Sequence, residues 1–131
     1  MNIKKRSLYV SILALVIVFA YNYMNPSEIQ SISTEDLANR LQGKNGNDAL
    51  YIDVREHDEF EAGHIEGMLN FPLSNLEESM KKIPKDIEVV IICQSGNRSM
   101  QAAELFQKNG YENIVNVEGG INSWQGELVQ K

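Results

Sequence analysis

A strand-like run that ends in the only cysteine of the chain most restricts how this sequence can fold. Residues 89–92 read Val-Val-Ile-Ile, and four β-branched residues in a row are typical of a strand buried on both faces. Cys93 follows directly, then the polar residues 94–98, and then residues 99–108 with apolar side chains at helical spacing. A buried strand, a short loop and a helix in this order indicate a parallel α/β sheet, with Cys93 at the carboxyl end of a strand.

The loop after Cys93 is suited to hold a thiolate or a bound anion. The residues from Cys93 to Arg98 can curl so that their backbone N–H groups converge above the sulfur, with Gly96 at the tightest part of the curl. We expect Arg98 either to hold the shape of the loop or to neutralise an anion. We expect Ser99 either to cap the helix or to donate to the thiolate. A thiol in this place should ionise more readily than a free one. The alternative is an inert buried cysteine.

Neither histidine of the chain is expected to act as a base for Cys93. His57 and His64 lie on a different strand–helix connection, and His64 stands in a Gly-His-Ile turn that indicates a structural role. Peptide hydrolysis by a cysteine needs a histidine partner. A thiolate that attacks sulfur needs no such donor, because the leaving sulfur departs as an anion. The sequence therefore favours exchange at sulfur.

The composition argues against metal ions and nucleic acid as partners. One cysteine and two histidines show no zinc-ligand spacing, so we expect no metal site and no cofactor. Residues 25–131 hold 9 Lys and Arg against 18 Asp and Glu, a formal net charge of −9. Such a surface repels nucleic acid and anionic lipid. The acidic side chains within residues 56–61 are expected to form a solvated helix face.

An apolar segment follows a basic N-terminal cluster. Residues 1–6 contain three basic side chains, and residues 7–24 contain no charged one. This pattern predicts a single-pass transmembrane signal anchor in the cell membrane, with residues 1–6 in the cytoplasm and the rest of the chain outside it. The alternative is export after cleavage of a secretory signal following Ala20. Residues 25–30 are expected to be a linker, and residues 31–131 the domain.

The remaining sequence alternates predicted strands with predicted helices. We expect strands at residues 49–54, 67–71, 89–92 and 114–117, and a brief edge strand near Ile32. We expect helices from Ser33 to near Gly43, over residues 57–62 and 74–82, after Arg98, and from about Ile121. Residues 44–47 are expected to form a turn. This alternation predicts a parallel sheet with ligands at the carboxyl ends of the strands.

In combination, the motifs of residues 32–125 resemble a single rhodanese domain. They are Asp53-Val54-Arg55-Glu56, Gly63-His64-Ile65-Glu66-Gly67, Asn70-Phe71-Pro72-Leu73, the segment from Cys93 to Ser99, and Gly119-Gly120-Ile121 with Trp124. The resemblance implies a rhodanese-like, five-stranded parallel sheet flanked by helices. In this chain one transmembrane helix would precede that domain.

The same resemblance implies a sulfurtransferase. Cys93 would accept a sulfane sulfur as a persulfide from thiosulfate, a persulfide or a polysulfide, and would pass it to a thiol-like acceptor, either a small molecule or a protein. Residues 94–97 are neutral, which makes a persulfide or polysulfide at least as good a donor as the thiosulfate dianion. The substrate-binding residues would be Gln94, Ser95, Gly96, Asn97, Arg98 and Ser99. Asp53 and Arg55 would support the base of the loop.

Two other functions remain open at this point. The first is a non-catalytic rhodanese-like module that binds a partner through the same loop. The second is a cysteine phosphatase or arsenate-type enzyme of similar fold. The related phosphatases have a loop one residue longer between cysteine and arginine, and the shorter ring here argues against a phosphate ligand.

Overall fold

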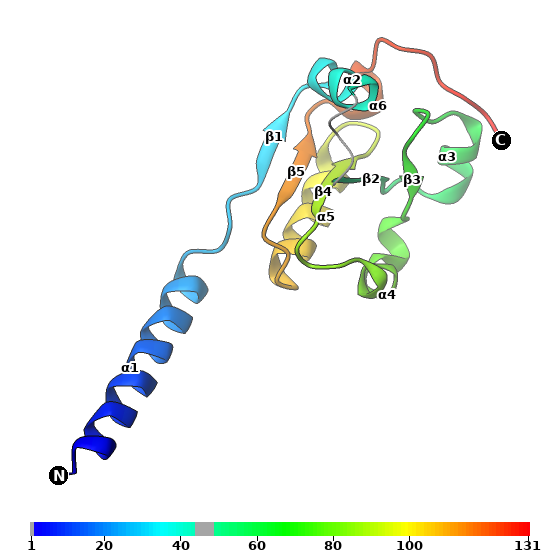
Figure 1. Cartoon of the computed structure of the whole chain (residues 1–131). Helices are drawn as coiled ribbons and strands as arrows, with labels where there is room; N and C mark the ends of the chain where they lie inside the picture. Colours follow the sequence, from blue (N-terminus) through cyan, green and yellow to red (C-terminus); the bar gives the residue numbers. More distant parts are fainter. Residues whose placement is uncertain (1, 44–48) are drawn as a thin grey trace.

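The computed structural model describes residues 2–43 and 49–131 and contains a five-stranded sheet (Figure 1). The strands are β1 (Gln30–Ile32), β2 (Ala49–Asp53), β3 (Leu69–Asn70), β4 (Glu88–Ile92) and β5 (Ile114–Val117). Their order across the sheet is β1-β5-β4-β2-β3, and all four pairings are parallel. The predicted α/β class and parallel sheet are confirmed. The predicted turn at residues 44–47 lies outside the described residues.

The central strand β4 is buried because its side chains are apolar on both faces. Val89 and Ile91 pack into one hydrophobic cluster, and Val90 and Ile92 pack into the other. All four side chains are fully buried. Successive side chains of a strand point to opposite faces. A strand that is covered on both sides therefore needs an uninterrupted run of apolar residues. The carboxyl end of this strand presents Cys93.

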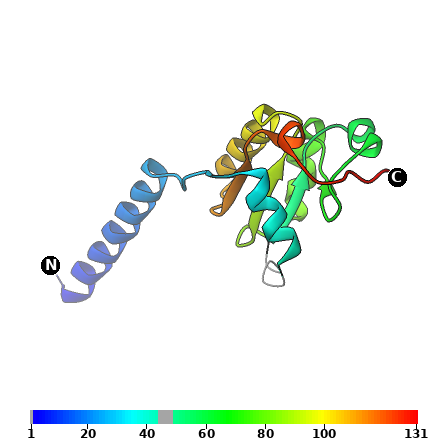
Figure 2. The same cartoon turned by 90° about the horizontal axis from the view of Figure 1, so that it is seen from above.

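Helices cover both faces of the sheet (Figure 2). Beside the N-terminal α1 (Ile3–Met24), they are α2 (Thr34–Gln42), α3 (His57–Ala62), α4 (Leu76–Ser79), α5 (Asn97–Lys108) and α6 (Gly120–Ser123), with short 3₁₀ turns η1 (Leu73–Asn75) and η2 (Met80–Lys82). Phe106 of α5 packs into the cluster that holds Ile91, whereas Leu37 of α2 packs into the one that holds Ile92. α5 and α2 thus cover opposite faces of the sheet with their apolar sides.

Local capping explains where α2 begins. The Ser33 hydroxyl accepts a hydrogen bond from the backbone N–H of Asp36 at 3.1 Å, and the Asp36 carboxylate accepts one from the backbone N–H of Ser33 at 3.4 Å. This reciprocal pair satisfies N–H groups that have no partner within the helix. The predicted helix start at Ser33 is confirmed, and the helix ends at Gln42, with Gly43 as its C-cap, near the predicted end.

Two predicted elements differ from the structure by more than a residue or two at their ends. The helix expected over residues 74–82 is divided into η1, α4 and η2. At the end of this segment the backbone carbonyl oxygens of Met80 and Ile83 lie 2.6 and 2.7 Å from the Tyr111 hydroxyl, whose single proton is donated to one of them or shared between them. The strand expected over residues 67–71 shortens to β3, because Gly67 adopts a φ of 93° that does not continue a strand.

The N-terminal helix α1 extends away from the sheet, and none of its described residues is buried (Figure 1). It begins at Ile3, so the basic cluster forms its first turns instead of preceding it. Its 22 residues have a mean hydropathy of 1.8 in their most apolar window. At about 1.5 Å per residue such a helix reaches about 33 Å, close to the roughly 30 Å of a bilayer core. By length and composition, α1 can therefore span a membrane.

Candidate active site

The sulfur of Cys93 lies at the floor of the loop that connects β4 to α5. The backbone N–H of Gly96 donates to Sγ at 3.1 Å, and the Ser99 hydroxyl oxygen lies 3.3 Å from Sγ. Gly96 has a φ of 103°, a left-handed conformation that side chains disfavour. Glycine at this position therefore lets the loop turn tightly enough to aim an amide at the sulfur.

The surroundings of Cys93 stabilise the thiolate. Burial raises the pKa of the thiol, because the residue is only 1% exposed. Hydrogen bonds from the Ser99 hydroxyl and from the backbone N–H groups of Ser99, Gly96 and Ser95 lower it, and together they outweigh burial. The net pKa of Cys93 lies below its ordinary value.

Ser99 contacts the sulfur and does not cap the helix. α5 begins at Asn97 with Gly96 as its N-cap, so Ser99 is already the third helical residue, and the prediction that Ser99 caps the helix is wrong. Its hydroxyl lies 3.0 Å from the carbonyl oxygen of Gly96. One hydroxyl carries one proton. The proton can be donated to that carbonyl while Cys93 is a thiol, and to Sγ once the thiolate forms.

Asp53 and Arg55 form a buried ion pair at the carboxyl end of β2, beside the loop. Their side chains are 0% and 4% exposed, and the closest guanidinium and carboxylate atoms are 2.8 Å apart. Arg55 also donates to the backbone carbonyl of Gly63 at 2.8 Å and to the Gln94 side-chain oxygen at 3.3 Å. Arg55 therefore connects β2, the turn after α3 and the first residue of the loop.

Arg98 is held by a carboxylate from another part of the chain. Its guanidinium makes two hydrogen bonds to Glu59, at 2.7 and 2.8 Å. This hydrogen bonding lowers the pKa of Glu59 to about 2. The pairing favours the role of holding the loop in shape over that of neutralising a ligand.

The acidic side chains within residues 56–61 were expected to form a solvated face of α3, and this expectation is wrong for two of them. Glu59 is paired with Arg98, and Glu56 accepts a hydrogen bond from the Ser74 hydroxyl at 2.8 Å.

The N-terminus of α6 fixes the outer side of the loop, a contact that sequence reasoning missed. The backbone N–H of Ile121 donates to the carbonyl of Cys93 at 2.9 Å, and that of Asn122 donates to the carbonyl of Gln94 at 3.0 Å. Because these carbonyls point toward α6, the amides that follow are free to turn toward the sulfur. A Cβ at Gly120 would lie 2.3 Å from the Cys93 carbonyl oxygen, so only glycine allows this approach. The signal for this contact in the sequence was the glycine pair Gly119-Gly120, where the last helix begins.

Comparison with known proteins places this arrangement in a family. Residues 33–127 match the rhodanese-like domain family. The chain belongs to that family. A protein of Allochromatium vinosum named sulfurtransferase is 38% identical over 96 residues, which cover 73% of this chain and 88% of that protein. The uncharacterized protein YqhL of Bacillus subtilis is 37% identical over 118 residues, 90% of each chain.

Solved structures show the same fold. A crystal structure of a rhodanese-like domain protein from Staphylococcus aureus superposes with a TM-score of 0.70 at 30% identity. The match covers 79% of this chain and 99% of that one. The predicted rhodanese-like fold is therefore confirmed, and relatives of this chain are named sulfurtransferases.

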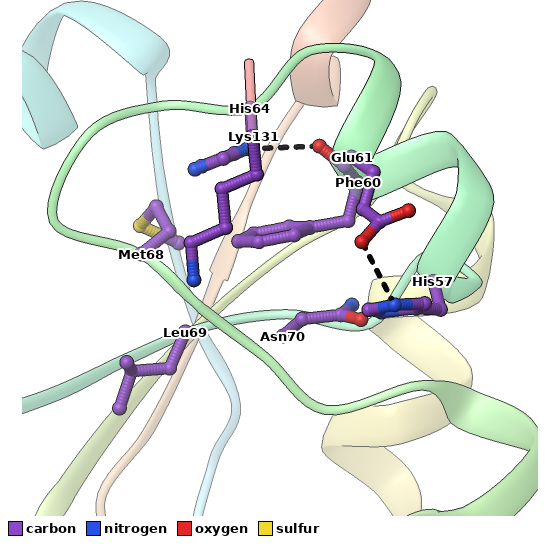
Figure 3. A pocket seen from close by; sticks show the side chains of 8 residues that line it. All are labelled: His57, Phe60, Glu61, His64, Met68, Leu69, Asn70 and Lys131. Carbon is purple, nitrogen blue, oxygen red and sulfur yellow. Dashed lines mark hydrogen bonds and ion pairs between the residues drawn. The ribbon is translucent and has the colours of Figure 1, made fainter. Parts of the chain in front are cut away.

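In this rhodanese-like domain both histidines are engaged away from the loop. His64 stacks on Phe60 with ring centroids 3.8 Å apart, and its Nδ1 lies 2.8 Å from the Phe60 carbonyl oxygen. His57 pairs with Glu61 at 3.1 Å. Both histidines line a pocket of about 330 Å³ that Lys131 also borders (Figure 3). Within the described part of the chain, neither histidine hydrogen-bonds to Cys93.

Proposed function

We propose that the protein is a sulfurtransferase in which Cys93 alternates between a thiolate and a persulfide. The observation that carries the proposal is the sulfur of Cys93 beneath a loop whose amides and Ser99 hydroxyl stabilise negative charge. A persulfide places its charge on a terminal sulfur, one bond farther from the chain. The backbone N–H groups of Ser95, Gly96 and Ser99, which stabilise negative charge on Sγ, would also be donors for that outer sulfur.

The chemical steps need no protein base. The Cys93 thiolate attacks the outer sulfur of a donor, the sulfur–sulfur bond of the donor breaks, and the leaving group departs with the electron pair. A thiolate acceptor then attacks the outer sulfur of the Cys93 persulfide and restores the Cys93 thiolate. Charge balances in both steps. The engagement of both histidines elsewhere is consistent with this chemistry.

Substrate binding by backbone groups is part of the proposal. The side chains of Ser95 and Asn97 are exposed, whereas the Gln94 side chain contacts Arg55 and Asn122. We assign Gln94, Ser95, Gly96, Asn97, Arg98 and Ser99 to the substrate cradle, and Asp53 and Arg55 to its support. The partners would be small sulfur donors and thiol acceptors.

The pairing of Arg98 argues against a phosphatase. An oxyanion enzyme of this type needs its loop arginine to bind the equatorial oxygens of the substrate. Here both arms of the Arg98 guanidinium are bound to Glu59. The loop also has only four residues between Cys93 and Arg98, which leaves little room for a tetrahedral anion. Both observations favour transfer of a single sulfur atom.

We also propose that α1 anchors the protein in the cell membrane. In this arrangement residues 1–6 stay in the cytoplasm, residues 7–24 cross the bilayer, and residues 25–30 lead to a domain over residues 31–131 on the other side. The support is the length and hydropathy of α1 together with its basic first turn. Cleavage after Ala20 would instead release the same domain outside the cytoplasm.

Steady-state kinetics test the proposed transfer. With an alkyl persulfide as donor and cyanide as acceptor, we expect thiocyanate to form and double-reciprocal plots to give parallel lines, because donor and acceptor react in separate steps. Lines that intersect would contradict a persulfide intermediate on the protein. A chain that forms no thiocyanate with any sulfane donor would favour the non-catalytic binding module.

A further inference from the structure

We propose that Glu59 determines the donor class: it keeps the doubly charged thiosulfate out of the site and leaves singly charged persulfides as the donors. This inference rests on the proposed sulfur transfer. It assigns a specificity role to a residue outside the loop, on α3. Glu59 acts by pairing with the Arg98 guanidinium, which a dianion would otherwise bind.

The Glu59 carboxylate binds the Nη1 and Nη2 groups of Arg98 and neutralises the charge of the guanidinium. These two groups lie 2.7 and 2.8 Å from the two carboxylate oxygens. Glu59 is itself fixed, because its Oε2 also accepts the backbone N–H of Glu56 at 3.0 Å in the capping box of α3. A two-point contact between planar groups is the most specific form of an Arg–carboxylate pair.

Arg98 is close enough to the sulfur for its charge to matter. The charge of Cys93 contributes to the raised pKa of Arg98, after the larger effect of the hydrogen bond with Glu59. Without Glu59, Arg98 would therefore present a positive charge within electrostatic reach of a donor at Sγ. When Glu59 is charged, the Glu59–Arg98 pair has no net charge and contributes little electrostatic potential at Sγ.

The second guanidinium beside the loop is neutralised in the same way. Arg55 is paired with Asp53 at 2.8 Å and is almost fully buried. Residues 94–97 carry no charge. Thus both cations that border the loop have carboxylate partners, and an incoming anion meets the Cys93 thiolate with no compensating charge. Because Coulomb repulsion scales with the product of the charges, a dianion is repelled about twice as strongly as a monoanion.

The two donor reactions differ in the charge that the site must accept. Thiosulfate gives its outer sulfur to the Cys93 thiolate and leaves as sulfite. The site therefore holds three negative charges before and after the step, one on Cys93 and two on the donor or the sulfite. A persulfide anion gives its outer sulfur to the Cys93 thiolate and leaves as a singly charged thiolate, which takes a proton from water after its release. The second reaction gathers two negative charges. The paired arginines suit the second case.

The variant Glu59→Gln tests the proposal with both donors. Glutamine keeps the length of the side chain and can still accept the N–H of Glu56, but it leaves the charge of Arg98 unpaired. We expect kcat/KM for thiosulfate to rise on the order of tenfold at low salt, and the gain to shrink as ionic strength rises. For the persulfide of 2-mercaptoethanol, whose only charge lies on sulfur, we expect a gain of about threefold, because half the charge halves the interaction energy.

Glu61→Gln is the matched control. It removes the same charge from the same helix, but Glu61 pairs with His57 and not with Arg98. Residues two apart on a helix do not share a face, so we expect both donors to react as with the unchanged protein. An equal thiosulfate gain in Glu61→Gln would show a general charge effect and would overturn the proposal.

The remaining outcomes separate this inference from the proposed function. Unchanged thiosulfate transfer in Glu59→Gln, or a loss of transfer from both donors, would overturn the specificity role. In the second case Glu59 would serve only to hold the loop. If the unchanged protein transfers sulfur from neither donor, the proposed function fails and this inference fails with it.

Discussion

Replacing Cys93 by serine is expected to abolish sulfur transfer from every sulfane donor. An alcohol oxygen is not ionised by a few hydrogen bonds, and it cannot carry a persulfide. The fold should survive, because serine occupies a similar volume and can still accept the N–H of Gly96 and contact Ser99. Thiocyanate formation measures the activity, and thermal unfolding followed by circular dichroism measures the fold.

Ser95→Ala is the control for this substitution. The Ser95 side chain is exposed, and its contribution to the low pKa of Cys93 comes from the backbone N–H, which alanine retains. We expect this variant to keep at least about half of the activity, since the loop acts through its backbone. Residual turnover in a pure Cys93→Ser sample would contradict the assignment of the nucleophile.

Replacing Gly120 by alanine should lower sulfur transfer on the order of a hundredfold, since displacements near 1 Å at a reacting centre cost about that much. The added Cβ would lie 2.3 Å from the Cys93 carbonyl oxygen and 2.7 Å from the carbonyl carbon and oxygen of Gln94. All three are backbone atoms and cannot turn aside as a side chain would. The loop must move, and the amides that face the sulfur must move with it.

Gly67→Ala separates this clash from ordinary backbone strain. Gly67 has a φ of 93°, and among the described residues its added Cβ would meet only a Leu41 methyl carbon, at 3.6 Å. Alanine should therefore cost about 1–2 kcal/mol of stability from the left-handed conformation alone. We expect transfer per folded molecule to stay close to that of the unchanged protein. An equal loss in both variants would show that general destabilisation, and not displacement of the loop, explains the effect of Gly120→Ala.

Local pattern was enough to predict the centre of the sheet. β5 has the predicted bounds, Ile114–Val117, and β4 begins one residue before the predicted start. These strands are recognisable because they are apolar on both faces and therefore need no knowledge of their neighbours. β3 was less predictable, since a short edge strand with an exposed Leu69 has little pattern of its own. Its extent is set by pairing with β2.

The contacts that shape the candidate site were less accessible to sequence reasoning because they join distant segments. Glu59 and Arg98 are 39 residues apart, and the carboxylate occurs within an acidic run that resembles a solvated face. The carbonyls of Cys93 and Gln94 meet the N-terminus of α6 only after the sheet has formed. The place of Cys93 at the end of β4 and beneath the loop was predictable, since a strand and a glycine-containing loop flank it in the sequence. The partners that tune its charge depend on tertiary structure.

Intact-mass measurement of the protein after exposure to a persulfide donor tests the persulfide on Cys93 most directly. We expect the desalted protein to gain the mass of one sulfur atom, cyanide to remove this gain as thiocyanate, and Cys93→Ser never to acquire it. A protein that consumes the donor while its own mass stays unchanged, or a Cys93→Ser variant that gains the same mass, would contradict the account.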